Sequence, residues 1–269
     1  MIKLVVTDID GTLLNSERKI TRRVHDTLQK AREKGVYVVL CTGRPLPGVK
    51  HLLEELDLIT DKDFVITYNG ALVQGTGDGK TYAHFPMNYQ DFVTVSSLGD
   101  QEKVHYHAID DKAIYVTTAD IGQYSFHESE LTGMPIEHTT NEAIQKEAQF
   151  TKMMYIDTPE LLNQLIANMP VEMKERYTFL RSEPYYLEVL NKQASKGKAV
   201  ERLAQLLGIT QEEVMCLGDN ENDLDMIEYA GVGVAMGNAV DSVKAVANYV
   251  TTTNNEDGVA VAVEKFVLE

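Results

Sequence analysis

Five short apolar runs rich in β-branched residues constrain the fold of this chain most. The runs lack the in-out alternation of half-exposed strands, so they predict strands that are covered on both faces, as in a parallel sheet. Segments with helical periodicity lie between them, and strands that alternate with helices indicate βαβ units. We therefore predict an α/β fold with a doubly wound parallel sheet. In chain order, the runs are KLVVTD, VYVVLC, DFVITY, VMCLGD and VGVAM.

The helical segments carry recognisable start and stop signals. In TRRVHDTLQKAREKG, apolar residues recur at Val24, Leu28 and Ala31, Thr21 is a candidate N-cap, and Gly35 ends the pattern. These signals are typical of an amphipathic helix with one buried face. The segments KGKAVERLAQLLG and ENDLDMIEYAG have the same character.

The middle of the chain breaks this rhythm. From about Phe85 to Leu187, hairpin-like segments alternate with helical ones, which indicates an α+β domain with its own antiparallel sheet. A chain of 269 residues is long enough for two unequal domains. We therefore predict a core domain built from residues 1–84 and 188–269 and an inserted α+β domain at residues 85–187.

Composition and charge limit the partners of the protein. The formal net charge of −16 argues against nucleic acid and anionic membranes, both of which require clustered Lys and Arg. An anionic small substrate is compatible with this charge, because a bound divalent cation can make one cleft locally positive. With two cysteines, no long apolar run and no leader pattern, we predict a cytoplasmic protein with reduced thiols, either a monomer or a homodimer.

Polar residues follow three of the predicted strands at their carboxyl ends. In open α/β sheets, ligands bind at this edge. We therefore expect these sequence-distant side chains to meet at one site. They are Asp8 and Asp10 after KLVVT, Thr42 and Arg44 after VYVVLC, and Asp219 and Asp223 after VMCLG.

The DIDGT stretch allows two interpretations. It can be an Asx-turn that leads out of a strand, with Gly11 supplying an unusual backbone angle. Alternatively, Asp8 and Asp10 can point the same way, one as a nucleophile or metal ligand and the other handling protons.

The other polar stretches are similarly open when each is taken alone. Thr42 can cap the helix that follows Pro45, or its hydroxyl and the Gly43 amide can hold an anion. Lys196 begins a helix, where a cation is mildly unfavourable, and this placement hints at an anionic partner. Asp219 follows Gly218 at a strand end, as expected for a ligand of a hard cation.

His105 and His107 could form a metal pair on one strand. No acid or cysteine close to them in the sequence completes a ligand set. We therefore interpret the pair as ordinary alternation in a strand of the inserted domain.

Taken together, the stretches DIDGT, CTGR, SKG and GDNEND resemble the four motifs of the haloacid dehalogenase superfamily. They occur in that order, with a large insertion between the second and third. This layout resembles the Cof-type phosphatases of that superfamily, and ITYNGALVQ and LEVLNKQASKG are similar to a sugar phosphatase of the group. The resemblance implies a Rossmann-like core with an inserted cap.

The resemblance also implies a mechanism centred on two acids. Asp8 is expected to attack phosphorus and form an aspartyl-phosphate, and Asp10 to act as general acid and base. Mg²⁺ is expected to be held by the Asp8 carboxylate, the Asp10 backbone carbonyl and Asp219, with Asp223 as a supporting acid.

The remaining site residues implied by the resemblance bind substrate. They are Thr42, Gly43, Lys196 and Asn222 around the phosphoryl oxygens, with Arg44 and Asn69 as further candidates near the cleft. The cap is expected to exclude water and to select the leaving group, and the substrate is expected to be a small phosphate monoester such as a sugar phosphate. Two rivals stay open: a phosphomutase with the same core, and a non-catalytic phosphate-binding module, which has no need of Asp10.

Overall fold

The computed structural model describes all 269 residues and divides the chain into two compact units. The first, here called the core unit, consists of Met1–Ala83 and Ser195–Glu269. The second, the inserted unit, is His84–Ala194. Each unit has its own main sheet and its own hydrophobic core.

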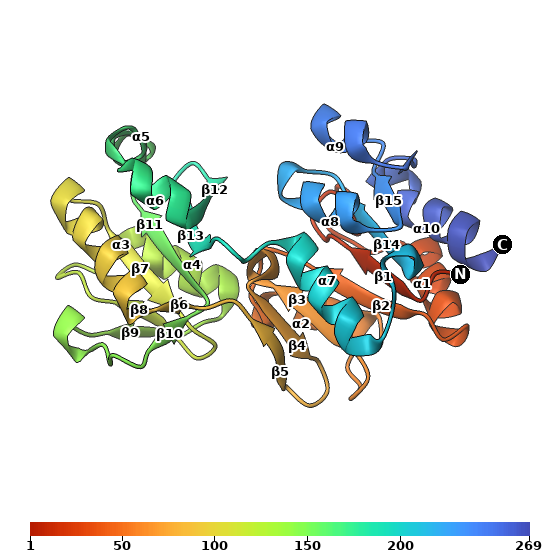
Figure 1. Ribbon diagram of the computed structural model, residues 1–269, viewed down its shortest axis with the longest axis horizontal. Helices are drawn as coiled ribbons and strands as arrows, with labels where there is room; N and C mark the ends of the chain where they lie inside the picture. The colour runs from red at the N-terminus through yellow and green to blue at the C-terminus, as the bar shows by residue number, and fades with distance from the viewer. The chain divides into compact units, whose positions relative to one another are not determined.

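The core unit contains an eight-stranded sheet in the order β16-β15-β14-β1-β2-β3-β4-β5 (Figure 1). All neighbours from β16 to β3 pair in parallel, and β4 is antiparallel to β3. The predicted doubly wound α/β fold is confirmed. The strands are β1 (Leu4–Thr7), β2 (Tyr37–Cys41), β3 (Phe64–Thr67), β4 (Leu72–Gly75), β5 (Thr81–His84), β14 (Val214–Gly218), β15 (Val232–Ala235) and β16 (Tyr249–Val250).

Helices of the core unit follow the strands, as the periodicity predicts. They are α1 (Arg22–Glu33), α2 (Lys50–Glu55), α7 (Lys196–Leu207), α8 (Leu224–Tyr229), α9 (Asp241–Val246) and α10 (Gly258–Val263). The short single-turn elements are η1 (Leu46–Gly48), η2 (Tyr68–Gly70), η4 (Gln211–Glu213), η5 (Glu221–Asp223), η6 (Asn254–Glu256) and the π-helical η7 (Glu264–Leu268). Thr21 caps α1, because its side chain accepts a hydrogen bond from the Val24 amide at 3.2 Å.

Strand β1 lies in the middle of this sheet and is covered on both sides. Val5 and Val6 point to opposite faces, and both are fully buried. Helix α1 packs with α10, and α7 packs with α8. The chain runs outward from β1 through β2 to β3 and later returns on the other side of β1 as β14. Such a reversal of strand order opens a crevice at the carboxyl ends of the strands.

The inserted unit is an α+β domain. Its six-stranded sheet has the order β12-β13-β11-β7-β8-β9, and all its pairs are antiparallel except β8 with β9. Strands β6 (Met87–Asn88) and β10 (Gln149–Phe150) form a separate two-stranded sheet. The strands of the six-stranded sheet are β7 (Tyr106–Ile109), β8 (Ile114–Val116), β9 (Ile136–His138), β11 (Lys152–Ile156), β12 (Tyr177–Glu183) and β13 (Tyr186–Asn191). Its helical elements are α3 (Tyr89–Glu102), α4 (Gln123–Thr132), η3 (Asn141–Ala143), α5 (Pro159–Asn168) and α6 (Val171–Arg176).

The division of the chain differs from the prediction mainly at the second boundary. The sequence placed this boundary between residues 187 and 188, whereas the structure places it between Ala194 and Ser195. The earlier position cuts β13, which pairs with β12 as far as Asn191 and buries Val189 in the core of the inserted unit. The apolar run that continues past residue 187 belongs to this antiparallel strand.

Two further features concern the cysteines and the helices. Cys41 on β2 and Cys216 on β14 are buried and form no disulfide. Strand β1 separates them in the sheet, so they act as two independent core residues. None of the helices combines the length and the apolar character needed to cross a bilayer.

Candidate active site

The structure brings the carboxylates of the core unit together at one edge of its sheet. Asp8 directly follows β1, and Asp219 directly follows β14, which is parallel to β1. With Asp223, these residues offer carboxylate oxygens that all lie within 4.8 Å of one another. The carboxyl ends of β1 and β14 therefore carry a cluster of three acids.

Lys196 joins two of these acids. Its Nζ donates to Asp8 Oδ1 at 2.5 Å and to Asp223 Oδ1 at 2.6 Å. Lys196 is 1% exposed, Asp223 is fully buried and Asp8 is 7% exposed. The second oxygen of Asp223 accepts the backbone N–H groups of Asp219 and Asn220, at 2.9 and 3.0 Å. Asp223 thus orients both the lysine and the loop that carries Asp219.

Helix packing explains how the SKG stretch delivers this lysine. Ser195 caps α7 by accepting from the Lys198 amide at 3.3 Å, so Lys196 is the first helical residue. The Gly197 amide donates to Asp225 Oδ2 at 3.0 Å. A Cβ at Gly197 would lie 2.6 Å from the Asp225 carbonyl oxygen, so only glycine permits this close approach.

The cluster contains more negative than positive groups: three carboxylates and one lysine. Burial raises the pKa of Asp8 to about 8, although the charge of Lys196 opposes the shift. Burial also raises the pKa of Asp219 to about 6, against a hydrogen bond from Thr12. For Lys196, burial favours loss of the proton, but the charges of Asp8 and Asp223 outweigh it and raise its pKa. The cluster therefore holds three carboxylates and one ammonium group, which contacts two of them.

Asp10 occupies a different environment from Asp8. Its side chain is 53% exposed and forms a bidentate ion pair with Arg44, whose Nε and Nη2 lie 2.9 and 2.5 Å from its two oxygens. The sequence did not reveal this partner, because the two residues are 34 positions apart. The DIDGT turn thus presents one buried and one exposed carboxylate.

Four of the predicted phosphate-binding residues lie together where the segments after β2, β3 and β14 meet. The Asn69 amide donates to the Thr42 carbonyl at 2.9 Å, and Asn222 Nδ2 donates to Asn69 Oδ1 at 3.1 Å. A Cβ at Gly43 would lie 2.9 Å from Asn69 Nδ2, so Gly43 keeps the two loops in contact. Thr42 does not cap the following helical turn: its hydroxyl accepts from the Arg44 amide at 3.1 Å, and Pro45 is the N-cap residue of η1.

Two residues that the sequence reasoning left without a role support the acidic loops. The Thr12 hydroxyl donates to Asp219 Oδ1 at 2.9 Å and is 1% exposed. Asn238 Nδ2 donates to the Gly11 carbonyl at 2.8 Å. Gly11 has φ +84°, where glycine is favoured, and a Cβ there would collide with the Asp219 carboxylate. In the sequence, the Gly-Thr pair that follows the two acids of DIDGT was the only indication that this turn contacts the Asp219 loop.

The donor set suits a hard divalent cation. Asp8, Asp219 and Asp223 supply only carboxylate oxygens, which Mg²⁺ prefers. Burial raises the pKa of Asp8 and Asp219 because it disfavours their ionised forms, and a bound cation would compensate the charge of these carboxylates. Since both oxygens of Asp223 already accept hydrogen bonds, Asp8 and Asp219 are the more direct candidates for ligands.

Comparisons with known proteins agree with this architecture. A protein of Bacillus subtilis (strain 168) named "Putative phosphatase YxeH" is 45% identical over 268 residues, which cover 100% of this chain and 99% of that protein. The crystal structure of a haloacid dehalogenase-like hydrolase from Bacteroides thetaiotaomicron is 31% identical, with TM-score 0.85 and coverage of 98% and 99%. The sugar phosphatase BT4131, of HAD subclass IIB, is 26% identical, with TM-score 0.77 and coverage of 98% of each chain. Residues 5–263 match the model of the haloacid dehalogenase-like hydrolases, and the chain belongs to this family.

Proposed function

We propose that this enzyme hydrolyses small phosphate monoesters, sugar phosphates above all, with Mg²⁺ and through an aspartyl-phosphate on Asp8. The family makes the chain a phosphoric monoester hydrolase. What we propose beyond this class is the metal ion, the covalent intermediate and the class of substrate. Its main support is the buried Asp8 carboxylate, which Lys196 holds beside Asp219.

Asp8 is the proposed nucleophile. Its Oδ1 is held by Lys196 at 2.5 Å, which leaves Oδ2 to attack phosphorus in line. The new Oδ2–P bond forms as the P–O bond to the leaving group breaks, and the electron pair of that bond goes to the leaving alkoxide. Because phosphoryl transfer depends mostly on positioning and electrostatics, a nucleophile held by a buried lysine suits this step.

Asp10 is the proposed acid and base. It gives a proton to the leaving alkoxide and then takes one from the water that hydrolyses the aspartyl-phosphate. Its bidentate pairing with Arg44 fixes the direction of the carboxylate. Its exposed position is compatible with access of water.

The remaining site residues bind the metal and the phosphoryl group. The Asp8 carboxylate, the Asp10 backbone carbonyl and Asp219 would hold Mg²⁺, while Asp223 would orient Lys196 and the Asp219 loop. When bound, this ion supplies positive charge between an anionic nucleophile and an anionic substrate. The other phosphate-binding groups of the proposal are Thr42, the Gly43 amide, Lys196 and Asn222, with Asn69 holding Asn222 in place and Arg44 holding Asp10.

The proposed substrates are sugar phosphates. The similarity to a protein named as a sugar phosphatase supports sugar phosphates. We assign selection of the leaving group and exclusion of water to the inserted unit. The cytoplasmic location and the choice between monomer and homodimer stay predictions from the sequence.

A screen of phosphate esters tests this function directly. We expect release of inorganic phosphate from small sugar phosphates in the presence of Mg²⁺ and its loss when a chelator is added. Free phosphate is measured against a no-enzyme control for every ester. An isomeric sugar phosphate without free phosphate, formed when a sugar bisphosphate is added, would support the phosphomutase, and no turnover across the panel would support the binding module.

Mg²⁺ affinity is expected to rise with pH between about 6 and about 8. In the metal-free protein the raised pKa values of Asp219 and Asp8, about 6 and about 8, mean that protons compete for the carboxylates in this range. Calorimetric titrations in two buffers of different ionisation enthalpy should show proton release on binding. Affinity that is independent of pH, without proton release, would contradict a site on these two acids.

A further inference from the structure

Two acids lie against His105 in the inserted unit, although neither is near it in the sequence. The sequence suggested that no acid completes a ligand set for His105 and His107. In the structure the two histidines have separate surroundings: His107 is fully buried beside Ser125, whereas His105 lies between Asp120 and Asp157. Long-range folding therefore supplies the acids that the local sequence lacks.

Asp157 fixes the orientation of the His105 ring. Its Oδ2 lies 2.8 Å from His105 Nδ1 and also accepts the His105 backbone N–H at 3.2 Å. Its Oδ1 accepts the Thr158 backbone N–H at 2.8 Å, and the residue is 7% exposed. An ionised carboxylate only accepts hydrogen bonds, so the Nδ1 atom carries the proton. In the neutral imidazole, Nε2 therefore presents a lone pair on the far side of the ring.

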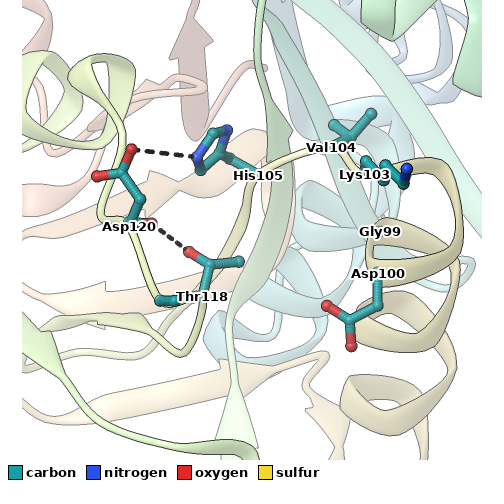
Figure 2. A pocket seen from close by; sticks show the side chains of 8 residues that line it. Gly99, Asp100, Lys103, Val104, His105, Thr118 and Asp120 are labelled. Atoms are coloured by element: carbon teal, nitrogen blue, oxygen red, sulfur yellow. Dashed lines mark hydrogen bonds and ion pairs between the residues drawn. The ribbon is translucent and has the colours of Figure 1, made fainter.

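That lone pair faces a second carboxylate. His105 Nε2 lies 3.8 Å from Asp120 Oδ2, which is too long for a hydrogen bond, and Figure 2 shows the two side chains turned toward each other. Two electron-rich atoms repel at this distance unless a proton or another cation lies between them. Asp120 is held in place through its Oδ1, which accepts from the Gly122 amide at 3.2 Å, and its carbonyl, which accepts from the Thr118 hydroxyl at 2.6 Å.

Two cavities that share His105 and Asp120 provide room for further ligand atoms. One cavity of about 250 Å³ is lined by Asp100, Thr118, His105 and Asp120, among others (Figure 2). A second cavity of about 290 Å³ is also lined by His105 and Asp120. A Cβ at Gly122 would lie 3.1 Å from His105 Cδ2, so glycine at this position leaves space for the ring.

We propose that His105 Nε2 and the Asp120 carboxylate bind a divalent transition-metal ion such as Zn²⁺ or Ni²⁺, with water as the remaining ligands. A carboxylate on the Nδ1 side of the ring is the usual outer partner of a metal-binding histidine, because it fixes the ring and raises the basicity of Nε2. Imidazole favours Zn²⁺ and Ni²⁺ over Mg²⁺. With two protein ligands, the ion is exchangeable rather than permanently held.

This site is independent of the acidic cluster in the core unit. The cluster of Asp8, Asp219 and Asp223 offers oxygen atoms only and suits Mg²⁺, whereas the new site offers nitrogen and oxygen. An ion at His105 would join the loop before α4 to the start of β7 and to the residue that follows β11. Its expected effect is on the stability of the inserted unit.

Calorimetric titration of the full chain with Ni²⁺, in the presence of saturating Mg²⁺, tests the proposal. We expect one Ni²⁺ site that His105→Ala and Asp120→Asn each weaken by roughly tenfold or more, the effect that loss of even an outer partner can have. The matched controls His51→Ala and Asp111→Asn, which alter exposed residues elsewhere, should leave the affinity unchanged.

A second measurement separates binding from folding. Ni²⁺ should raise the thermal unfolding midpoint of the wild-type chain and of both controls, because a ligand stabilises the state that binds it. Loss of the contact with Asp157 should lower the metal-free midpoint of His105→Ala. Its far-UV circular dichroism should match that of the wild type, and the increase with Ni²⁺ should vanish. Equal Ni²⁺ affinity in wild type and His105→Ala, or no site in the wild type, would overturn the proposal.

Discussion

Asp8→Asn is expected to abolish turnover of every phosphate ester. The amide oxygen is a far weaker nucleophile than the carboxylate, and the substitution also removes a negative charge from the proposed Mg²⁺ site. A loss of roughly 10⁴-fold or more is expected, since removal of the attacking group costs at least this much in well-studied hydrolases. Phosphate release and mass spectrometry of acid-quenched protein, which detects the covalent phosphate, measure the two consequences.

The fold of this variant should remain intact. Asn has nearly the same shape as Asp, and its side-chain oxygen can still accept from Lys196, which stays paired with Asp223. Burial raises the pKa of Asp8 to about 8, so the ionised carboxylate is unfavourable in the metal-free protein. Unfolding of Asp8→Asn without metal should therefore need at least as much denaturant as the wild type. Substantial residual activity would instead indicate attack by a metal-activated water.

The fold was predictable because its signals are local. Continuous burial of Leu4–Thr7 follows from a short β-branched run that is covered on both faces, and the Thr21 cap follows from its position before a periodic segment. The boundary near residue 188 was not predictable in this way. An apolar run such as Tyr186–Asn191 looks the same in the central strand of either unit, and only its pairing with β11 and β12 assigns it.

The candidate site was predictable in part, for a related reason. Asp8 and Asp219 each directly follow a predicted strand, and the carboxyl ends of parallel strands lie at one edge of a sheet, so the sequence predicts that the two residues meet. Pairings across the site are set by side-chain directions that no spacing reveals. Examples are the ion pair of Arg44 with Asp10 and the hydrogen bond of Asn222 to Asn69, which spans 153 residues. The motif order suggested which residues belong to the site, whereas the structure was needed for their partners.

Asp10→Asn is expected to slow the first chemical step according to the leaving group. A sugar alkoxide requires a proton to depart, whereas nitrophenolate is stable enough to leave without one. With a sugar phosphate the step should slow by roughly a hundredfold or more, within the usual range for general acid catalysis, and with nitrophenyl phosphate much less. The control Glu17→Gln removes the same charge from an exposed residue of the same loop and should leave both rates unchanged.

The same variant should reveal the second role of Asp10. Without the base, hydrolysis of the aspartyl-phosphate becomes slow, so nitrophenyl phosphate should give a rapid burst of nitrophenol followed by slow turnover. Rapid mixing resolves the burst, and its amplitude should approach one equivalent of enzyme as the intermediate accumulates on Asp8. Loss of Asp10 also leaves Arg44 without its carboxylate partner, and a purely structural effect of that kind should slow both esters alike. Equal slowing of the first step without a burst would therefore assign Asp10 to positioning and remove it from proton transfer.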